Sequence, residues 1–391
     1  GIGKGENFIA SDIPAILNHT RRIYLLNENE LAVIEKDRIS FFDESGKEVG
    51  KEVFEVNWDV AAAEKGGFEH FMIKEIHEQP KAVKDTMTSR VLPDSAGIKL
   101  DDIKLTKEEL QNFNKIFMVA CGTAYHACMV GKYVIEKLAR IPVEVEIASE
   151  FRYRDPIVDE KTLTIIVSQS GETLDTLAAL KEARRKGSRI LSIVNVVGSS
   201  IARESHDVLY TWAGPEIAVA STKAYTTQLI AIYIIALYMA KLKGTLKDEE
   251  IESIKDEMRR LPGLVEETLK YKSAIQKFAT HNSNARDIFY LGRGIDYAVA
   301  LEGSLKLKEI SYIHSEAYAA GELKHGTIAL IEKGTIVLAV LTQDELYEKM
   351  VSNVKEVKAR GAFVFALAKE GSTEVENVAD YTLYIPKVSD I

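Results

Sequence analysis

A dense group of hydroxyl and amide side chains follows the apolar segment Leu163–Val167. It reads Ser168-Gln169-Ser170-Gly171-Glu172-Thr173, and a helical pattern begins at Leu174. A helix that starts at the end of a strand presents free N–H groups and a positive dipole end, which favour an anion. An ordinary helix cap with a capping-box glutamate is the alternative, but it needs only one or two of these groups. We therefore expect an anion site, in which hydroxyls donate to phosphate-type oxygens without adding charge.

Two more turns of this kind occur in the chain. Cys121-Gly122-Thr123-Ala124 follows the apolar run Ile116–Ala120, and Ser221-Thr222-Lys223 opens a long apolar helix. Each turn taken alone is more typical of a helix cap than of a site, and Cys121 alone is more typical of a buried thiol.

Ionisable residues gather in the segment from Leu301 to Glu309. At about 100° per residue, Glu302, Lys306 and Glu309 share one face of a helix. A solvated stripe of ion pairs is the simpler interpretation. If the group is partly buried, its pKa values would shift in a way that suits proton transfer.

One histidine stands near two glycines in Gly321-Glu322-Leu323-Lys324-His325-Gly326. A histidine on a loop can carry protons near neutral pH, although most loop histidines are simply solvated.

The elements that must position these residues follow a repeated strand–helix pattern. Apolar strands are predicted at Ile116–Ala120, Leu163–Val167 and Ile190–Val194, with helices to about Leu138 and over Leu174–Lys186. The pattern returns later in the chain at a constant offset, where Gly122, Tyr125, Gly131 and Glu150 meet Gly294, Tyr297, Gly303 and Glu322. The sequence thus predicts an α/β fold with two tandem doubly wound parallel-sheet units.

The two repeats differ at the hydroxyl-rich turn. The second repeat has Leu341-Thr342-Gln343-Asp344-Glu345 there, and its two acids would repel phosphate. We expect only the first repeat to keep the anion site.

Helices are predicted at about 222–243 and 248–280, with a break at Pro262-Gly263, and another helical pattern runs from Phe68 to Pro80. The first 55 or so residues are instead rich in short strands, predicted at Arg22–Leu26, Leu31–Glu35 and Ile39–Asp43. Strands with so little apolar content cannot build a core alone, so we expect them to belong to a larger domain.

The amino-acid composition and net charge limit the classes of function that the protein can have. The 391 residues carry a net charge of −9, which disfavours nonspecific nucleic-acid binding. The longest apolar run, Leu229–Ala240, is too short for a membrane span of roughly 20 residues and predicts a buried helix. Two cysteines with no zinc-type spacing favour a reducing cytoplasm. We find no metal or nucleotide motif and expect no cofactor and no metal.

Together these motifs resemble the glutamine–fructose-6-phosphate amidotransferase family (glucosamine-6-phosphate synthases). The resemblance rests on the Cys-Gly-Thr turn, the 168–173 motif, Ala220-Ser221-Thr222-Lys223, the 301–309 helix and the 322–326 segment. The opening Gly5-Glu6-Asn7-Phe8-Ile9-Ala10-Ser11-Asp12 is similar to the late part of that family's N-terminal-nucleophile glutaminase domain. The resemblance covers essentially the whole chain.

The resemblance implies two sugar-isomerase (SIS) units and a linked pair of reactions in amino-sugar biosynthesis. A glutaminase domain would release ammonia, and the isomerase part would convert fructose 6-phosphate and ammonia into glucosamine 6-phosphate. The implied domains are a glutaminase remnant at 1–60, a linker and helical lead-in at 61–110, SIS units at 111–245 and 285–391, and connecting helices at 246–284.

The resemblance also assigns residues. Glu309 would move the proton between C1 and C2 with Lys306 beside it, and His325 would open the sugar ring from the other subunit of a homodimer. The implied substrate-binding residues are Cys121, Gly122, Thr123, Ala124 (where relatives often have Ser), Ser168, Gln169, Ser170, Thr173, Val219, Ser221 and Glu302.

Two departures from the family pattern stand out. The N-terminal cysteine nucleophile and the C-terminal lysine that forms a Schiff base with the open sugar have no counterpart, so we expect a fragment of a longer enzyme. A sugar-phosphate deaminase or deglycase and a noncatalytic sugar-phosphate sensor are the alternatives.

Overall fold

The computed structural model describes residues 1–10, 14–16, 19–27, 29–56, 65–93, 98–100 and 102–390. The chain divides into two compact units, Gly1–Lys74 and Glu75–Ile391. The predicted boundary at residue 60 and the motif residues Ser11 and Asp12 lie outside the described residues.

The N-terminal unit is built from short antiparallel strands. β1 (Arg22–Ile23) pairs with β5 (Phe54–Glu55), and β2 (Leu31–Ile34), β3 (Ile39–Phe42) and β4 (Glu48–Val49) form a second sheet. The three predicted strands are present, although β1 is shorter than expected. A short 3-10 helix, η1 (Pro14–Ile16), brings Ile16 into a small cluster with Ile23 and Val56.

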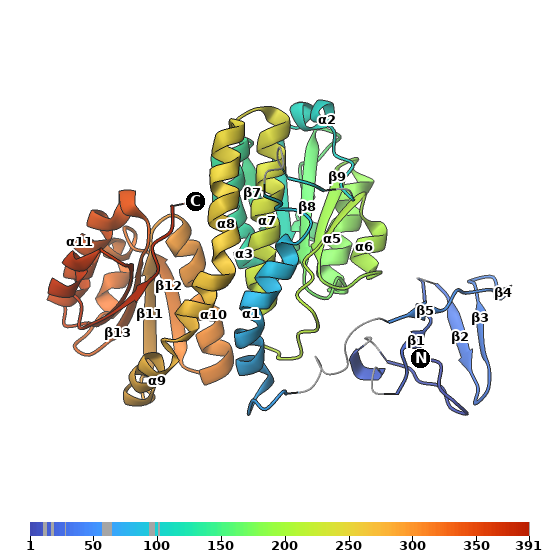
Figure 1. Cartoon of the computed structure of the whole chain (residues 1–391), viewed down its shortest axis with the longest axis horizontal. Coiled ribbons are helices and arrows are strands. Elements are labelled where there is room, and N and C mark those ends of the chain that lie inside the picture. Colours follow the sequence, from blue (N-terminus) through green and yellow to red (C-terminus); the bar gives the residue numbers. More distant parts are fainter. Residues whose placement is uncertain are drawn as a thin grey trace. The chain divides into compact units, whose positions relative to one another are not determined.

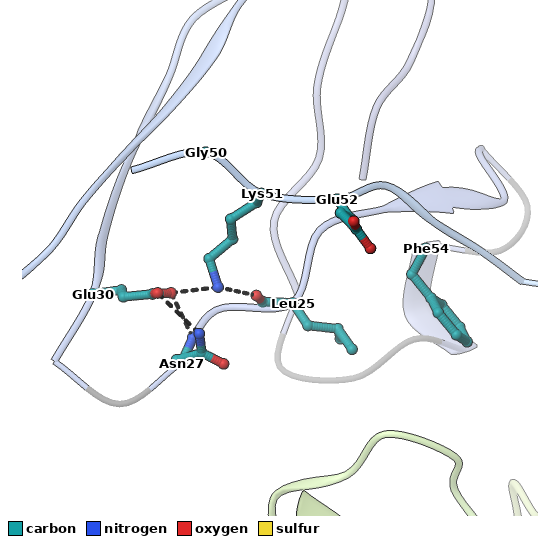
Figure 2. A pocket seen from close by; sticks show the side chains of 7 residues that line it. All are labelled: Leu25, Asn27, Glu30, Gly50, Lys51, Glu52 and Phe54. Carbon is teal, nitrogen blue, oxygen red and sulfur yellow. Dashed lines mark hydrogen bonds and ion pairs between the residues drawn. The ribbon is translucent and has the colours of Figure 1, made fainter. Parts of the chain in front are cut away.

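A polar cluster stabilises this unit around a cavity of about 250 Å³ (Figure 2). Nζ of Lys51 lies 2.5 Å from Oε2 of Glu30 and donates to the Leu25 carbonyl at 2.6 Å. Glu30 also accepts hydrogen bonds from the backbone and side chain of Asn27. The hydrogen bond from Lys51 is the main reason why the pKa of Glu30 is lowered. The polar groups of this cluster bond to one another, and these hydrogen bonds hold Leu25 and Asn27 next to Glu30 and Lys51.

The first parallel sheet of the larger unit follows the predicted strands closely. It has the order β7-β6-β8-β9-β10, formed by β6 (Lys115–Ala120), β7 (Val143–Ile147), β8 (Thr162–Ser168), β9 (Arg189–Val194) and β10 (Asp207–Tyr210). Side chains of β6 alternate between two cores. Ile116 and Met118 face one core, with α3 (Gly122–Ala139) and α7 (Lys223–Lys243), and Phe117 and Val119 face the other. The second core contains α4 (Ala148–Tyr153), α5 (Leu174–Arg185) and α6 (Ser200–Glu204).

The second parallel sheet repeats the strand order of the first. It runs β12-β11-β13-β14-β15, formed by β11 (Asp287–Gly292), β12 (His314–Ala319), β13 (Ile336–Leu341), β14 (Phe363–Lys369) and β15 (Tyr381–Ile385). α11 (Tyr347–Ala359) belongs to the core on one face of this sheet. α10 (Ile295–Ser311) packs on β11 and β12, and its other side meets α3 of the first half. Figure 1 shows the two sheets with their helices.

The remaining helices and 3-10 helices complete the larger unit. They are α1 (Phe71–Met87), α2 (Lys107–Asn112), α8 (Asp248–Leu269), α9 (Lys272–His281), η3 (Leu323–His325), η4 (Thr327–Leu330), η5 (Asp344–Leu346) and η6 (Thr373–Asn377). Phe278 of α9 packs edge-on against Phe365 of β14, which attaches α9 to the second sheet.

The duplication extends to individual close contacts. A Cβ on Gly131 of α3 would lie 2.8 Å from Met118, and a Cβ on Gly303 of α10 would lie 2.9 Å from Tyr290. The two glycines are related by the same sequence offset as their two partners. Gly122 and Gly294 are related by that offset too, and they stand at the start of the same two helices. Both have a positive φ, 55° at Gly122 and 57° at Gly294. The predicted tandem repeat is therefore confirmed in backbone conformation and in packing.

Helix α7 is long and apolar enough to cross a membrane, by length and composition alone. In the structure 61% of its most apolar window is buried, and it packs against α3 and carries many residues of the main core. This is the buried helix that the sequence predicts.

Two predicted helix ends at prolines are wrong. α8 continues through Pro262, and α1 continues through Pro80 to Met87. A proline removes one backbone hydrogen bond, but packing can hold the helix together across it. Ala82, Val83 and Met87 are buried beyond Pro80, so the apolar face of α1 extends past the proline.

We predict that Gly303→Ala destabilises the larger unit by about 1–3 kcal/mol, because the new methyl group meets the ring of Tyr290. Gly263→Ala is the matched control. It lies in α8, where no described atom comes near its Cβ, and should be neutral or stabilising by up to about 1 kcal/mol. Denaturant unfolding measures both, and equal stability of the two variants would contradict the close contact.

Candidate functional site

Three turns meet at the carboxyl-terminal edge of the first sheet. β6 and β8 are parallel neighbours, so the turns that follow them lie side by side. Sγ of Cys121 lies 3.6 Å from Oγ1 of Thr176, which links the first turn to the start of α5. Cys121 is half-buried and a free thiol, so it is less buried than the sequence suggests.

The hydroxyl-rich turn forms a compact loop at the N-terminus of α5. Oγ of Ser168 accepts from the Gly171 N–H at 3.1 Å, and Oγ of Ser170 accepts from the Glu172 N–H at 3.1 Å. Thr173 is the N-cap residue, but its side chain makes no capping hydrogen bond. Glu172 accepts instead from the Ser200 N–H at 2.8 Å, so the predicted alternative of a capping box does not form. The first N–H groups of α5 thus keep their capacity to bind an anion.

The third turn, Ser221-Thr222-Lys223, is connected to this edge through Asn195, the residue that follows β9. The Asn195 N–H donates to the carbonyl of Gln169 at 3.1 Å, and its side-chain amide donates to the carbonyl of Gly214 at 2.7 Å. Glu216 then holds the turn at the start of α7. Its carboxylate accepts from Ser221 Oγ and from the N–H of Thr222, each at 2.8 Å. Val219 lies between Gly214 and Ser221, the two positions held by these hydrogen bonds, and it is fully exposed.

The predicted Lys–Glu group lies on α10 and faces the first half of the domain. Glu302 is buried, and its carboxylate accepts from Oγ1 of Thr123 at 2.9 Å and from Nδ1 of His126 at 2.7 Å. Nζ of Lys306 lies 3.5 Å from Glu302 and 2.5 Å from Glu309. The group is therefore more than a solvated stripe of ion pairs, since it joins α10 to the Cys121–Ala124 turn.

The three proton-transfer candidates are not all brought together. Glu309 is exposed, and its carboxylate contacts Nζ of Lys306. His325 is exposed in η3, and within the part of the chain that the structure describes we find no contact between its side chain and Lys306 or Glu309.

The corresponding edge of the second sheet is occupied by the protein's own groups. Asp296, the counterpart of Ala124 in the second repeat, accepts from the N–H of Thr342 at 2.8 Å and from its hydroxyl at 2.5 Å. Burial raises the pKa of Asp296. Nζ of Lys369 is buried between Asp344 at 2.7 Å and Asp390 at 2.5 Å. Burial alone would lower the pKa of Lys369, but the hydrogen bonds to these two carboxylates raise it.

Sequence reasoning missed His126, Asn195 and Glu216. His126 follows Thr123 by three residues, which is one helical turn, so their spacing could have placed both on the face that meets Glu302. Asn195 and Glu216 lie in turns and gave no periodic signal. Among the described residues we find no group of three or more metal-binding side chains.

Comparison with known proteins gives a consistent result. The SIS domain family matches residues 109–238 and 283–391. The chain is 65% identical over 386 residues to a glutamine–fructose-6-phosphate aminotransferase (isomerizing) of Caldanaerobacter subterraneus, covering 99% of this chain and 63% of that protein. The enzyme of the same name from Thermus thermophilus is 47% identical, with 99% of this chain and 64% of the relative covered. The chain thus spans a little under two thirds of the length of these relatives.

Solved structures agree with these matches. The C-terminal domain of glucosamine-fructose-6-phosphate aminotransferase from Francisella tularensis matches with a TM-score of 0.79 and 44% identity, covering 83% of this chain and 91% of that domain. A glucosamine-6-phosphate deaminase from Thermotoga maritima matches with a TM-score of 0.63 at 22% identity, covering 81% and 88%, which shows a shared fold alone.

We predict that Ala124→Asp weakens binding of inorganic phosphate at least tenfold. The new carboxylate would take the place that Asp296 has in the second repeat and would repel an anion at the Ser168 turn. Ala124→Ser, which adds a neutral hydroxyl, is the control and should bind like the parent chain. Calorimetric titration measures both, and an unchanged affinity of the aspartate variant would place the anion elsewhere.

Proposed function

Because the chain belongs to the SIS-domain family and, within it, to the glutamine–fructose-6-phosphate aminotransferases, we propose that it is the isomerase part of such an enzyme. Its reaction would convert fructose 6-phosphate and ammonia into glucosamine 6-phosphate. One observation carries the proposal: a hydroxyl-rich helix N-terminus that suits a phosphate lies beside the Cys121–Ala124 turn, which is joined through Thr123 and Glu302 to the Lys306–Glu309 pair.

The phosphate would bind at the turn after β8. Ser168, Gln169, Ser170 and Thr173 surround the N-terminus of α5 there, and the amide groups supply positive potential without a basic side chain. This explains how a chain of net charge −9 can hold an anionic sugar. The sugar would extend along the Cys121-Gly122-Thr123-Ala124 turn toward Val219 and Ser221, with Glu302 beneath it.

The chemistry would be carried by Glu309. After ammonia adds to C2 of the open-chain ketose and water leaves, an imine forms. The Glu309 carboxylate would take a proton from C1 and return it to C2, while the C1 hydroxyl loses a proton and the imine nitrogen gains one, which yields the 2-amino aldose. Lys306, 2.5 Å from Glu309, would orient this carboxylate. The exposed position of Glu309 suits contact with a bound sugar.

His325 would open the sugar ring from the partner subunit of a homodimer. Its exposure in η3, away from Lys306 and Glu309 of its own chain, supports a role in a second copy's site. Ammonia would come from a glutaminase domain to which the β-rich N-terminal unit belongs. We place the reaction in the cytoplasm, and the two free thiols are compatible with a reducing compartment.

Calorimetry tests the substrate class. We expect the chain to bind fructose 6-phosphate and glucose 6-phosphate, because both offer the same phosphate to the Ser168 turn. Fructose without phosphate is the control and should bind far more weakly. If the folded chain binds neither hexose 6-phosphate, the proposal is wrong.

Glu309→Gln tests the catalytic assignment in the longer enzyme. We predict loss of hexose-phosphate interconversion, with the dissociation constant for fructose 6-phosphate within about tenfold, because an amide keeps the shape of the side chain but cannot take a proton. Coupled assays of product formation measure the first quantity and calorimetry the second. Retained turnover would exclude Glu309 as the proton-transfer group.

A further inference from the structure

The N-terminal half of α1 presents three polar side chains to the loop that carries Val219 and Ser221. The side chains belong to Glu75, Glu78 and Gln79. They lie far before this loop in sequence, and each makes a hydrogen bond to it or to the start of α7.

Glu75 makes the most direct contact. Its Oε1 accepts from the N–H of Ile217 at 2.6 Å and from the N–H of Ala218 at 3.2 Å. The residue is 2% exposed, and burial raises the pKa of its carboxyl. A single buried oxygen therefore fixes two successive peptide groups directly before Val219.

The two neighbouring contacts fix the other end of the loop. Glu78 pairs with the buried Lys223 at 2.6 Å, and Gln79 accepts from Oγ1 of Thr226 at 2.6 Å. Both partners lie in the first turn of α7, immediately after Ser221 and Thr222. The loop is thus held to α1 on both sides of Val219.

Packing cannot hold the loop in the same way. Val219 is fully exposed and Ile217 is 37% exposed, and the buried apolar side chain between Gly214 and Ser221 is the small methyl group of Ala220, so apolar burial contributes little there. The conformation of the segment depends instead on hydrogen bonds to Glu75 and to Glu216.

We propose that Glu75 is a positioning residue for the sugar site, which acts through the backbone of Ile217 and Ala218 to place Val219 and Ser221 against the sugar. This inference rests on the proposed function. It extends that function to a residue that does not touch the substrate and stands at the start of the larger unit.

The test compares Glu75→Ala with Glu75→Gln in the chain itself. Alanine removes the acceptor, whereas the glutamine carbonyl can still accept from both N–H groups. Asp85→Ala is the matched control, because Asp85 lies on the same helix and pairs with Lys81 at the surface. Circular dichroism and thermal unfolding check folding. If Glu75→Ala does not fold, Glu75→Asp replaces it, since the shorter side chain withdraws the acceptor but keeps the charge.

Calorimetry then separates the sugar contacts from the phosphate contacts. We expect Glu75→Ala to raise the dissociation constant of fructose 6-phosphate about tenfold. The dissociation constant of inorganic phosphate should stay unchanged, because the backbone groups that Glu75 holds belong to the 217–218 segment and not to the Ser168 turn. Glu75→Gln should remain within about threefold of the parent chain, and Asp85→Ala should match it. In the longer enzyme, Glu75→Ala should raise KM far more than it lowers kcat.

Three results would overturn the inference. These are unchanged binding of fructose 6-phosphate by Glu75→Ala, an equal loss for sugar phosphate and inorganic phosphate, or a loss in Glu75→Gln as large as that in Glu75→Ala. If the parent chain binds no hexose 6-phosphate, the proposed function itself fails. Faster hydrogen exchange at Ile217 and Ala218 in Glu75→Ala would then report the contact without any ligand.

Discussion

The candidate site depends on the carboxylate of Glu302, which joins the two halves of the duplicated domain. It accepts hydrogen bonds from Thr123 and His126 on the first helix of one repeat and pairs with Lys306 on the first helix of the other. Because Glu302 is buried, the loss of one of these partners would leave a poorly compensated charge, which is costly. This set of contacts holds α10 against α3 and links the Lys306–Glu309 pair to the Cys121–Ala124 turn.

The two repeats differ by a few substitutions at the sheet edge where we propose the anion site. The first repeat has Ala124, Ser170 and Asn195 where the second has Asp296, Asp344 and Lys369. In the second repeat Asp296 accepts hydrogen bonds from Thr342, and Lys369 pairs with Asp344 and Asp390, so the polar groups of these side chains are already engaged within the protein. In the first repeat the small Ala124 adds no charge, and the side chain of Asn195 turns to the 211–214 loop. The N-terminus of α5 therefore stays available.

The sequence predicts the local elements better than the contacts between them. Strand Ile116–Ala120 and the helix that starts at Leu174 agree with the structure within one residue, because their apolar periodicity and their glycines set both ends. The helix ends predicted at Pro80 and Pro262 are wrong, because tertiary packing outweighs the one backbone hydrogen bond that each proline removes. Glu75 could not be assigned, because its backbone partner Ile217 lies 142 residues away and no periodic pattern reports such a pair. His126 was missed although its spacing from Thr123 places both on one helix face, because its partner Glu302 is 176 residues away.

A crystal structure of the chain with bound fructose 6-phosphate tests the central claim most directly. We predict that the phosphate lies within hydrogen-bonding distance of Ser168, Ser170 and Thr173 at the N-terminus of α5, with C1 and C2 of the sugar facing Glu309. A phosphate bound at the edge of the second sheet near Thr342, or a sugar that points away from α10, would contradict the account.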